Sequence, residues 1–285
     1  MNPTAFRLQR ASASIWMAAG LTALAASSAM AEELTLDCVI DPSQKVNLGS
    51  PVTGLLADVQ VSRGDFVKAG DVVARIESSV EAATVQLGTV QAQSTEEIDA
   101  QRTRLKLAQD KLTRARALAD KGHVTTEQVE QAQADENVAE REVARLIQQK
   151  RIAELDLGRA QALLAERTIR SPISGFISER KLSPGEFVNQ DSYIVTIVAL
   201  SPLYVETYVP VAQWGQIQVG AVATVGLEQP IGGSYQATVK VVDRLFDAAS
   251  GTFGVRLELP NADGALPAGQ RCHVTFAALS ATDSQ

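Results

Sequence analysis

The sequence predicts a mixed α and β, multidomain protein. A small β unit is split by an inserted long antiparallel coiled-coil hairpin of helices, and a small antiparallel β-barrel follows. First, a strand-like stretch, 50–76, recurs without a gap at 171–197 with eight identical positions, where composition alone gives about one or two. Second, residues 78–167 space their apolar positions alternately by four and three, as coiled coils do. Third, residues 201–279 contain short alternating strands between turn residues, which favours a barrel.

The first 31 residues are interpreted as a cleavable signal peptide. Arg7 and Arg10 precede a short apolar run, and Ala29-Met30-Ala31 forms an A-x-A cleavage site. The apolar run is too short to span a membrane, so we expect an exported, unanchored protein of the periplasm. Removal of the signal leaves 24 basic against 33 acidic residues, a net charge of −9. Nucleic-acid binding requires clustered positive charge and is therefore excluded.

The duplicated β unit is expected to comprise residues 32–77 and 168–200. Gly54 and Gly64 of the first copy recur as Gly175 and Gly185 of the second, and glycines at such positions permit tight turns. Each copy is too short to bury a core alone, but together they provide about 60 residues, enough for a small sandwich or flattened barrel. The two copies are therefore expected to fold as one unit.

Residues 78–167 are expected to form the helical hairpin. The first helix begins at a capping box, Ser78 with Glu81, and ends at Lys121-Gly122, while the return helix begins at Thr125 with Gln128. Each arm would project about 60 Å at 1.5 Å per residue. The predicted seam is rich in alanine and partly polar, so either the backbones lie close together or a partner packs on the flank. Its members are Leu87, Gln91, Ser94, Ile98, Gln101, Leu105, Ala108, Leu112, Ala115 and Ala119 in the first helix, and Ala132, Glu136, Ala139, Val143, Leu146, Lys150, Ala153, Leu157, Ala160 and Leu164 in the second.

The barrel is expected at 201–279, followed by a flexible tail at 280–285. Two cysteines remain, Cys38 and Cys272. An oxidising compartment permits a disulfide, and the alternative is two small buried hydrophobic residues; the disulfide is favoured if the chain ends meet in space. With only two histidines, and with every methionine in the predicted signal, we expect no metal site. No catalytic constellation or phosphate-binding loop is recognisable, so neither an enzyme nor a cofactor is predicted.

The duplicated β unit resembles a biotinyl/lipoyl domain. Carrier proteins of that class present a lysine on the hairpin that joins the halves, where this sequence has Glu77-Ser78-Ser79, while Lys68 and Lys181 lie elsewhere. A carrier subunit therefore remains only an alternative. With the inserted hairpin, the barrel and the signal peptide, the chain resembles the membrane fusion proteins, which are periplasmic adaptor subunits of tripartite efflux and secretion systems. Further stretches that resemble this family are 168–175, 201–205, 250–257 and 266–270.

The resemblance implies an adaptor that links an inner-membrane efflux transporter to an outer-membrane channel. The resistance-nodulation-division class of transporter is favoured, with the ATP-binding-cassette class as the alternative. Self-association in a hexameric ring, held at the inner membrane through the transporter, is also implied. Adaptors of resistance-nodulation-division pumps add a membrane-proximal domain after the barrel, and this sequence ends at Gln285 without one. We therefore expect the barrel and the chain ends to contact the transporter.

Three residues near the hairpin turn match a docking motif of this family. Efflux adaptors carry an arginine, a leucine four residues later and a serine seven residues beyond it, and these residues dock to the outer-membrane channel. Arg114, Leu118 and Thr125 stand at that spacing. The alternative interpretation is a solvated helix face, an edge residue of the seam and an N-cap. A rival function is a periplasmic module that captures and delivers a solute; the exported substrate is not indicated.

Overall fold

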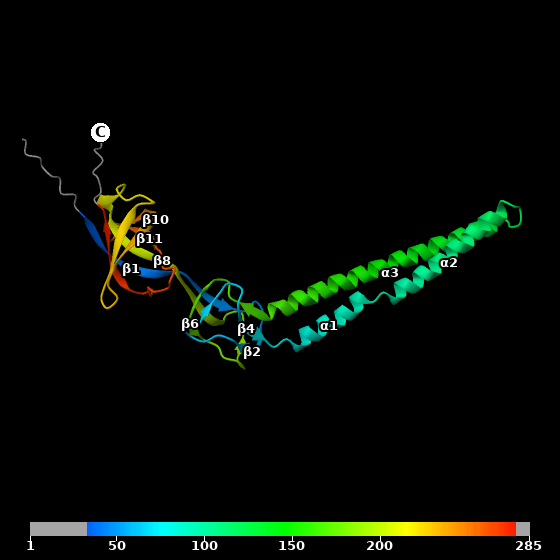
Figure 1. Ribbon diagram of the computed structural model, residues 1–285, viewed down its shortest axis with the longest axis horizontal. Coiled ribbons are helices and arrows are strands. Elements are labelled where there is room, and N and C mark those ends of the chain that lie inside the picture. Colours follow the sequence, from blue (N-terminus) through cyan, green and yellow to red (C-terminus); the bar gives the residue numbers. More distant parts are fainter. Residues whose placement is uncertain (1–32, 278–285) are drawn as a thin grey trace, which may run out of the picture.

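A computed structural model describes residues 33–277, so the predicted signal peptide and the predicted tail at 280–285 lie outside the described residues. The molecule is elongated, with a β-barrel at one end, a smaller β unit in the middle and a helical hairpin that projects from the other end (Figure 1). No helix within 33–277 has the length and apolarity that a membrane span requires.

The barrel consists of six antiparallel strands. These run in the order β1-β12-β9-β10-β11-β8, and β1 also pairs with β8, which closes the sheet on itself. Their inward side chains form one core that includes Val205, Val225, Phe253 and Val274. Closure leaves no free edge among these six strands. The strands are β1 (Leu34–Gly49), β8 (Tyr193–Pro210), β9 (Val222–Leu227), β10 (Ser234–Asp247), β11 (Thr252–Leu259) and β12 (Arg271–Phe276), with the short 3-10 helix η1 (Val211–Gln213) after β8.

The N-terminal strand corrects the expected start of the lipoyl-like unit. Residues 34–39 pair with β12, and residues 38–42 pair with β8 inside the barrel, although 32–77 were assigned to the lipoyl-like unit. Cys38 and Ile40 belong to the barrel core. The alternation of Leu34, Leu36, Cys38 and Ile40 with polar or exposed residues is the period-two pattern of a half-buried strand, so this signal was available in the sequence.

The middle unit is built from the two sequence copies, whose strands exchange partners. In β2 (Gly54–Val59), Leu55 pairs with Phe187 of β7 (Phe187–Val188), and in β3 (Phe66–Val67), Phe66 pairs with Phe176 of β6 (Gly175–Arg180). Leu56 exchanges backbone hydrogen bonds with Gly185 and Glu186, and Ile177 does the same with Gly64 and Asp65. The two sets of bonds are equivalent under the duplication. β4 (Val72–Ile76) and β5 (Thr168–Arg170) complete the smaller sheet β5-β4-β2-β7.

β1 and β8 join the barrel to the middle unit. They pair from Cys38 opposite Thr207 to Gly49 opposite Tyr193, with an irregularity between Pro42 and Gln44. The buried side chain of Asn261, on a barrel loop, donates to the carbonyl oxygen of Leu200 at 2.8 Å beside this irregularity. The connection between the two units is therefore a paired ribbon rather than a loose linker.

The hairpin contains three helices, where the sequence predicted two. They are α1 (Ser79–Gln93), α2 (Glu96–Ala119) and α3 (Thr126–Glu166). Polar contacts join Glu81 to Arg167, Ala92 to Lys150 and Arg116 to Gln133, so α3 runs antiparallel to α1 and α2. The expected single first helix is wrong, because the chain breaks helical geometry at Ser94 and Thr95. The expected capping box at Ser78 is also wrong, because Glu81 pairs with Arg167 and Ser78 makes no side-chain cap.

The predicted seam holds in the distal half of the hairpin and fails in α1. In α2 and α3 every predicted seam residue is buried or half-buried. In α1, by contrast, Leu87 and Gln91 are exposed, and the inward residues are Glu81, Val85, Gly88 and Ala92. The break at 94–95 therefore separates two helices whose inward faces are out of phase with each other.

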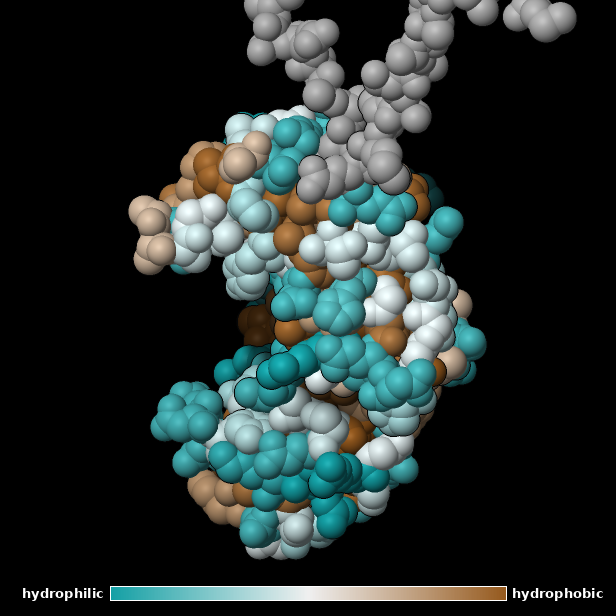
Figure 2. Space-filling view, turned by 90° about the vertical axis from the view of Figure 1, so that its left-hand side faces the viewer, coloured by the Kyte–Doolittle hydropathy of each residue, from teal (hydrophilic) through white to brown (hydrophobic). Residues whose placement is uncertain are grey.

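The barrel end of the molecule exposes apolar side chains among polar ones (Figure 2). In the barrel, Val219 and Leu245 are largely exposed, and Trp214 and Phe246 are partly exposed. The Trp214 ring packs edge-on against Phe246 at 4.8 Å and against the buried Phe253 at 5.1 Å between centroids. This aromatic group ties η1 to β10 and β11.

Candidate functional site: the hairpin tip, joint and base

The tip of the hairpin is a tight turn between α2 and α3. The amide of Gly122 donates to the carbonyl oxygen of Ala119 at 2.9 Å, and that of His123 to Leu118 at 3.0 Å. Gly122 has φ = 72°, a conformation that glycine adopts without steric cost. From the sequence we expected the helix to end at Lys121-Gly122, beside this turn. The turn is the part of the hairpin farthest from both β units (Figure 1).

The three predicted docking residues surround this turn. Arg114 and Leu118 lie on α2 one helical turn apart, so they share a flank, and both are exposed. Within the described residues, no carboxylate lies within ion-pairing distance of Arg114. Thr125 is exposed and caps α3: its hydroxyl accepts from the amide of Gln128 at 3.3 Å, and the Gln128 side chain accepts from the Thr125 amide at 3.0 Å. The second predicted capping box is confirmed.

The tip is braced by residues that the sequence interpretation missed. Arg116 of α2 donates to the side-chain oxygen of Gln133 on α3. Gln133 in turn donates to the Glu136 carboxylate at 2.7 Å. This chain of contacts crosses the hairpin just below the turn and explains why the seam contains Glu136. Glu136, a polar residue at a predicted seam position of α3, was the only signal available in the sequence.

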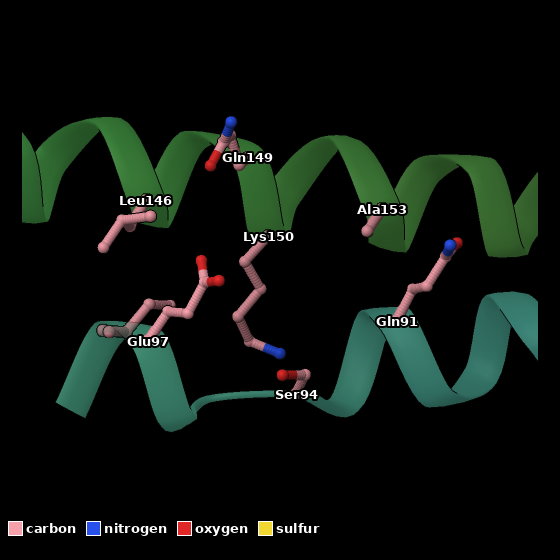
Figure 3. A pocket seen from close by; sticks show the side chains of 8 residues that line it. Gln91, Ser94, Glu97, Leu146, Gln149, Lys150 and Ala153 are labelled. Carbon is pink, nitrogen blue, oxygen red and sulfur yellow. The ribbon is translucent and has the colours of Figure 1, made fainter. Parts of the chain in front are cut away.

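The break between α1 and α2 has charged groups of opposite sign at its two ends. Lys150 extends from α3 toward the break (Figure 3), and its ammonium donates to the carbonyl oxygen of Ala92 near the C-terminus of α1. On the other side, the Glu96 carboxylate accepts from the Ser94 hydroxyl at 2.6 Å and the Thr95 amide at 3.0 Å. The Ser94 hydroxyl, followed by backbone amides, holds the pKa of Glu96 below its usual range.

These charges suit the two helix ends that meet at the break. A cation is favourable at the C-terminus of a helix and an anion at the N-terminus, because the unpaired carbonyl and amide groups there carry partial charges. Lys150 was a puzzling seam residue in the sequence. The contact of Lys150 with the end of α1 explains its place in the seam. This contact depends on the break between α1 and α2, which the sequence did not reveal.

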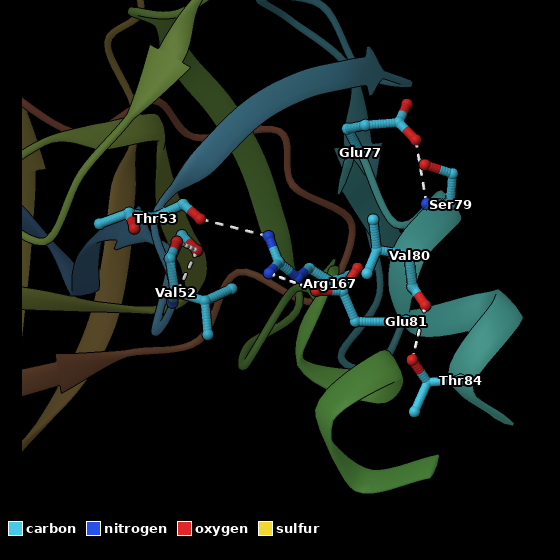
Figure 4. A network of polar contacts seen from close by, with 9 residues as sticks. Val52, Thr53, Glu77, Ser79, Val80, Glu81, Thr84 and Arg167 are labelled. Atoms are coloured by element: carbon cyan, nitrogen blue, oxygen red, sulfur yellow. Dashed lines mark hydrogen bonds and ion pairs between the residues drawn. The ribbon is translucent and has the colours of Figure 1, made fainter. Parts of the chain in front are cut away.

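An arginine at the C-terminal end of α3 fixes the base of the hairpin. Arg167 forms an ion pair with Glu81 of α1 at 2.6 Å and donates to the carbonyl oxygen of Thr53 at 3.2 Å (Figure 4). Both charged side chains are mostly buried. A β-carbon at Gly54 would lie 2.5 Å from the Ile76 side chain and 3.0 Å from Arg167. Arg167 therefore joins both helices of the base to the middle unit.

A groove on the barrel is the other candidate site. Its volume is about 850 Å³, and its lining includes Asp37, Glu206, Arg256 and His273. His273 lies 3.0 Å from Asp37, and Arg256 pairs with Glu206. Cys38 and Cys272, also in the lining, are joined by a disulfide. Residues 33–277 contain no group of three or more histidine, cysteine or acidic side chains arranged to hold a metal ion.

Family models match almost all of the described chain. A model described as CzcB-like, barrel-sandwich hybrid domain matches residues 44–199, which is more than half of the sequence. The chain belongs to the membrane fusion protein family. A second model, described as CusB-like, beta-barrel domain, matches residues 202–280. The first match covers the middle unit with its hairpin. The second match begins within β8 and covers the barrel strands that follow it.

Two curated proteins are similar to this chain over most of its length. The chain is 25% identical over 240 residues to nodulation protein NolF of Rhizobium meliloti (strain 1021), which covers 84% of this chain and 62% of the relative. It is 28% identical over 212 residues to nickel-cobalt-cadmium resistance protein NccB of Alcaligenes xylosoxydans xylosoxydans, covering 73% and 49%. The chain thus spans only about half to three fifths of the length of these relatives.

A solved structure shares the fold of this membrane fusion protein. The crystal structure of MacA from Actinobacillus actinomycetemcomitans matches with a TM-score of 0.74 at 21% sequence identity, covering 87% of this chain and 79% of MacA. The arrangement of barrel, middle unit and hairpin is therefore common to both.

Proposed function

We propose that this membrane fusion protein is a periplasmic adaptor that links an inner-membrane efflux transporter to an outer-membrane channel for the export of small molecules. The observation that carries the proposal is the separation of two contact regions: the hairpin turn lies at one end and the barrel at the other (Figure 1). α3 alone has 41 residues, which corresponds to about 60 Å at 1.5 Å per residue. One molecule can thus contact partners that are far apart.

The proposal assigns the hairpin turn to the outer-membrane channel. Arg114 offers an exposed charge and Leu118 an exposed apolar group on one flank, with Thr125 across the turn. The hydrogen bond from Arg116 to Gln133 joins α2 to α3 just below the turn, and ordering of the turn before docking would lower the entropy cost of docking. In this proposal α2 and α3 form a coiled coil whose seam is the predicted four–three pattern.

The barrel end is assigned to the transporter. Its exposed apolar residues, Trp214, Val219, Leu245 and Phe246, suit an interface core better than a wholly solvated surface. The lipoyl-like unit, 32–77 with 168–200, and the barrel, 201–279, would pack side by side in a ring of copies. The transporter supplies the energy for export, and the adaptor performs no chemical step.

The decisive experiment is cross-linking in intact cells, followed by isolation of this chain and identification of its partners by mass spectrometry. We expect to recover an outer-membrane channel together with an inner-membrane pump, and the identity of the pump will establish the transporter class. Recovery of neither partner from cells with active export would contradict the adaptor function.

The groove on the barrel favours a second candidate, a module that captures and delivers a solute. This function predicts that the melting temperature of the isolated monomer rises when the exported solute is added. If none of the solutes that the pump exports changes the melting temperature, the solute-capture function is contradicted and only the adaptor function remains.

A further inference from the structure

Helix α1 is one residue out of step with the register that α2 keeps with α3. Ile98 of α2 and Leu146 of α3 are both buried and line the same cavity. Eleven residues farther from the hairpin turn along each helix, this register would place Leu87 opposite Leu157, because both helices advance by the same rise per residue. In the structure Gly88 lies there instead, where an added β-carbon would be 3.5 Å from the Leu157 α-carbon. The break at 94–95 therefore contains a shift of one residue.

The sequence of α1 contains two overlapping patterns with coiled-coil spacing. The first pattern is the inward face in the structure and consists of Glu81, Val85, Gly88 and Ala92. The second pattern lies one residue earlier and consists of Val80, Thr84, Leu87, Gln91 and Ser94. Only the second pattern continues into the α2 seam without a change of spacing. A helix turns by about 100° per residue, so a rotation of that size about the α1 axis would exchange one pattern for the other.

The position of α1 in the structure leaves apolar groups in water and interrupts a helix. Val80 is 72% exposed and Leu87 is 60% exposed. Ser94 has an extended conformation, so the break creates two additional helix termini with unpaired backbone groups. A cavity of about 200 Å³ lies beside the break (Figure 3). Rotation to the second pattern would turn both apolar side chains toward α3, where their burial is favourable, and would let the helix continue through the break.

Polar contacts hold α1 in the position that the structure shows. Glu81 pairs with Arg167 at 2.6 Å, and this pair requires Glu81 on the inward face. Lys150 donates to the carbonyl oxygen of Ala92, which in a continuous helix would accept from the amide of Glu96. Apolar burial and these polar contacts therefore favour two different positions of the same helix.

We propose that α1 is a two-position switch that rotates by about 100° around its own axis. In the first position, which is the one in the structure and predominates in the free protein, α1 and α2 are separate helices. In the second position Leu87 faces Leu157, and residues 79–119 form one helix. A packed element with two discrete arrangements is a general basis of conformational switching. Both positions belong to a single chain, so the switch does not depend on the proposed partners.

Arg167 connects the switch to the middle unit. Besides its pair with Glu81, Arg167 donates to the carbonyl oxygen of Thr53. A β-carbon at Gly54 would lie 3.0 Å from its guanidinium group. A displacement at this edge of the middle unit that separates Arg167 from Glu81 would favour the second position, because it removes a contact made only in the first. Helix α1 would then transmit a change at the base of the hairpin to the break at 94–95.

Disulfide trapping in the purified protein distinguishes the two positions. Leu157→Cys is combined with Gly88→Cys to trap the first position or with Leu87→Cys to trap the second, and the native disulfide is retained. A β-carbon at Gly88 would lie 3.6 Å from that of Leu157, which suits a disulfide. We expect the Leu87→Cys protein to cross-link about ten to a hundred times more slowly, as for a state populated at about 1–10%. Gln86→Cys with Leu157→Cys is the matched control, because residue 86 is exposed and belongs to neither pattern.

Amide hydrogen exchange of the trapped proteins shows whether the break closes. In the oxidised Leu87→Cys protein, amides 94–97 should exchange at least about tenfold more slowly than in its reduced form, because they become part of one helix. The oxidised Gly88→Cys protein should show no such protection. Cross-linking of Leu87→Cys no faster than that of Gln86→Cys would overturn the switch, since it would reflect only local opening of α1. A trapped Leu87→Cys protein with unprotected amides 94–97 would overturn it as well.

The substitution Val80→Gln gives a second, independent test. Only the second position would bury residue 80, so a polar side chain there should slow cross-linking of the Leu87→Cys protein by at least about fivefold through the loss of apolar burial. Cross-linking of the Gly88→Cys protein should be unchanged. Val90→Gln is the matched control, because Val90 is 65% exposed and belongs to neither pattern. Equal effects of Val80→Gln and Val90→Gln on the Leu87→Cys protein would overturn the proposal.

Discussion

The two halves of the hairpin are built on different principles. The distal half, α2 with the facing part of α3, follows the predicted seam, and ten of the 24 residues of α2 are charged. The basal half contains α1, which has one charged residue among 15 and a seam of its own in a different phase. The distal half is thus an amphipathic helix pair with a buried seam and a charged outer surface. In the basal half, contacts of Arg167 and Lys150 join α1 to α3.

This difference indicates that the distal and basal halves of the hairpin have different roles. A charged, solvated distal half can extend into water and present its turn to a partner. In the basal half, α1 carries one charged residue and exposes Val80, Leu87 and Val90, so its outer surface is more apolar than that of α2. The break at Ser94 and Thr95 allows the two halves to differ, because it lets each half keep its own inward face while α3 continues straight through both.

The largest effect is expected from a substitution at the distal turn. Arg114→Glu should abolish export, because it reverses the exposed charge proposed to dock to the channel, while the free energy of unfolding should change by no more than about 0.5 kcal/mol, as for other surface substitutions. Export of a pump substrate from intact cells and urea denaturation of the purified variant are the two measurements. Lys106→Glu, at another exposed position of α2, is the control. Normal export by Arg114→Glu would refute the docking role.

The base of the hairpin should be the most sensitive to loss of one polar side chain. Arg167→Met removes the ion pair with Glu81 and the hydrogen bond to Thr53, which should cost about 1–3 kcal/mol of stability. Hydrogen exchange should show faster opening of α1 than of α2. Arg167→Lys keeps the charge but lacks the forked guanidinium geometry, so its stability should lie between those of wild type and Arg167→Met. Equal effects on α1 and α2 would show that the base is not a local clamp.

A smaller effect is expected at the break. Lys150→Met removes the cation at the C-terminal end of α1 and should cost about 0.5–1 kcal/mol, with Lys150→Arg as the charge-preserving control. Amide hydrogen exchange over 92–97 is the appropriate measurement, since the loss should be confined to this segment. Unchanged exchange there would mean that the contact with Ala92 does not stabilise the break.

The smallest effect concerns pH. The pKa of Glu96 is lowered in the folded protein by the Ser94 hydroxyl and nearby amides, so the carboxylate stabilises the fold above the pKa of an unfolded glutamate. That contribution is lost as the pH falls through the lowered pKa. Wild type should therefore exceed Glu96→Gln in urea midpoint near neutral pH, and the two should converge in acid. A constant difference at all pH values would contradict this origin.

Much of the fold could be predicted from local patterns. The 121-residue offset between the two copies predicts that the copies fold together, and the structure pairs Leu55 with Phe187 and Phe66 with Phe176 as equivalent contacts. The capping box of Thr125 with Gln128 was also predictable, because both partners are close in sequence. The family resemblance, rather than the residues alone, pointed to Arg114, Leu118 and Thr125 as a docking motif, and that role remains a prediction.

The sequence by itself determined the repeated β unit, the seam of the distal hairpin and the turn at Gly122, because each depends on neighbouring residues or on a regular spacing. Only the tertiary structure decided that the first part of β1 pairs within the barrel, where the chain breaks at 94–95, and which residues Glu81 and Lys150 contact. These features depend on groups far apart in the chain: Leu34 meets Phe276, and Glu81 meets Arg167. Local spacing gives the period of a helix, but the phase in which α1 faces α3 is decided by what α3 presents to it.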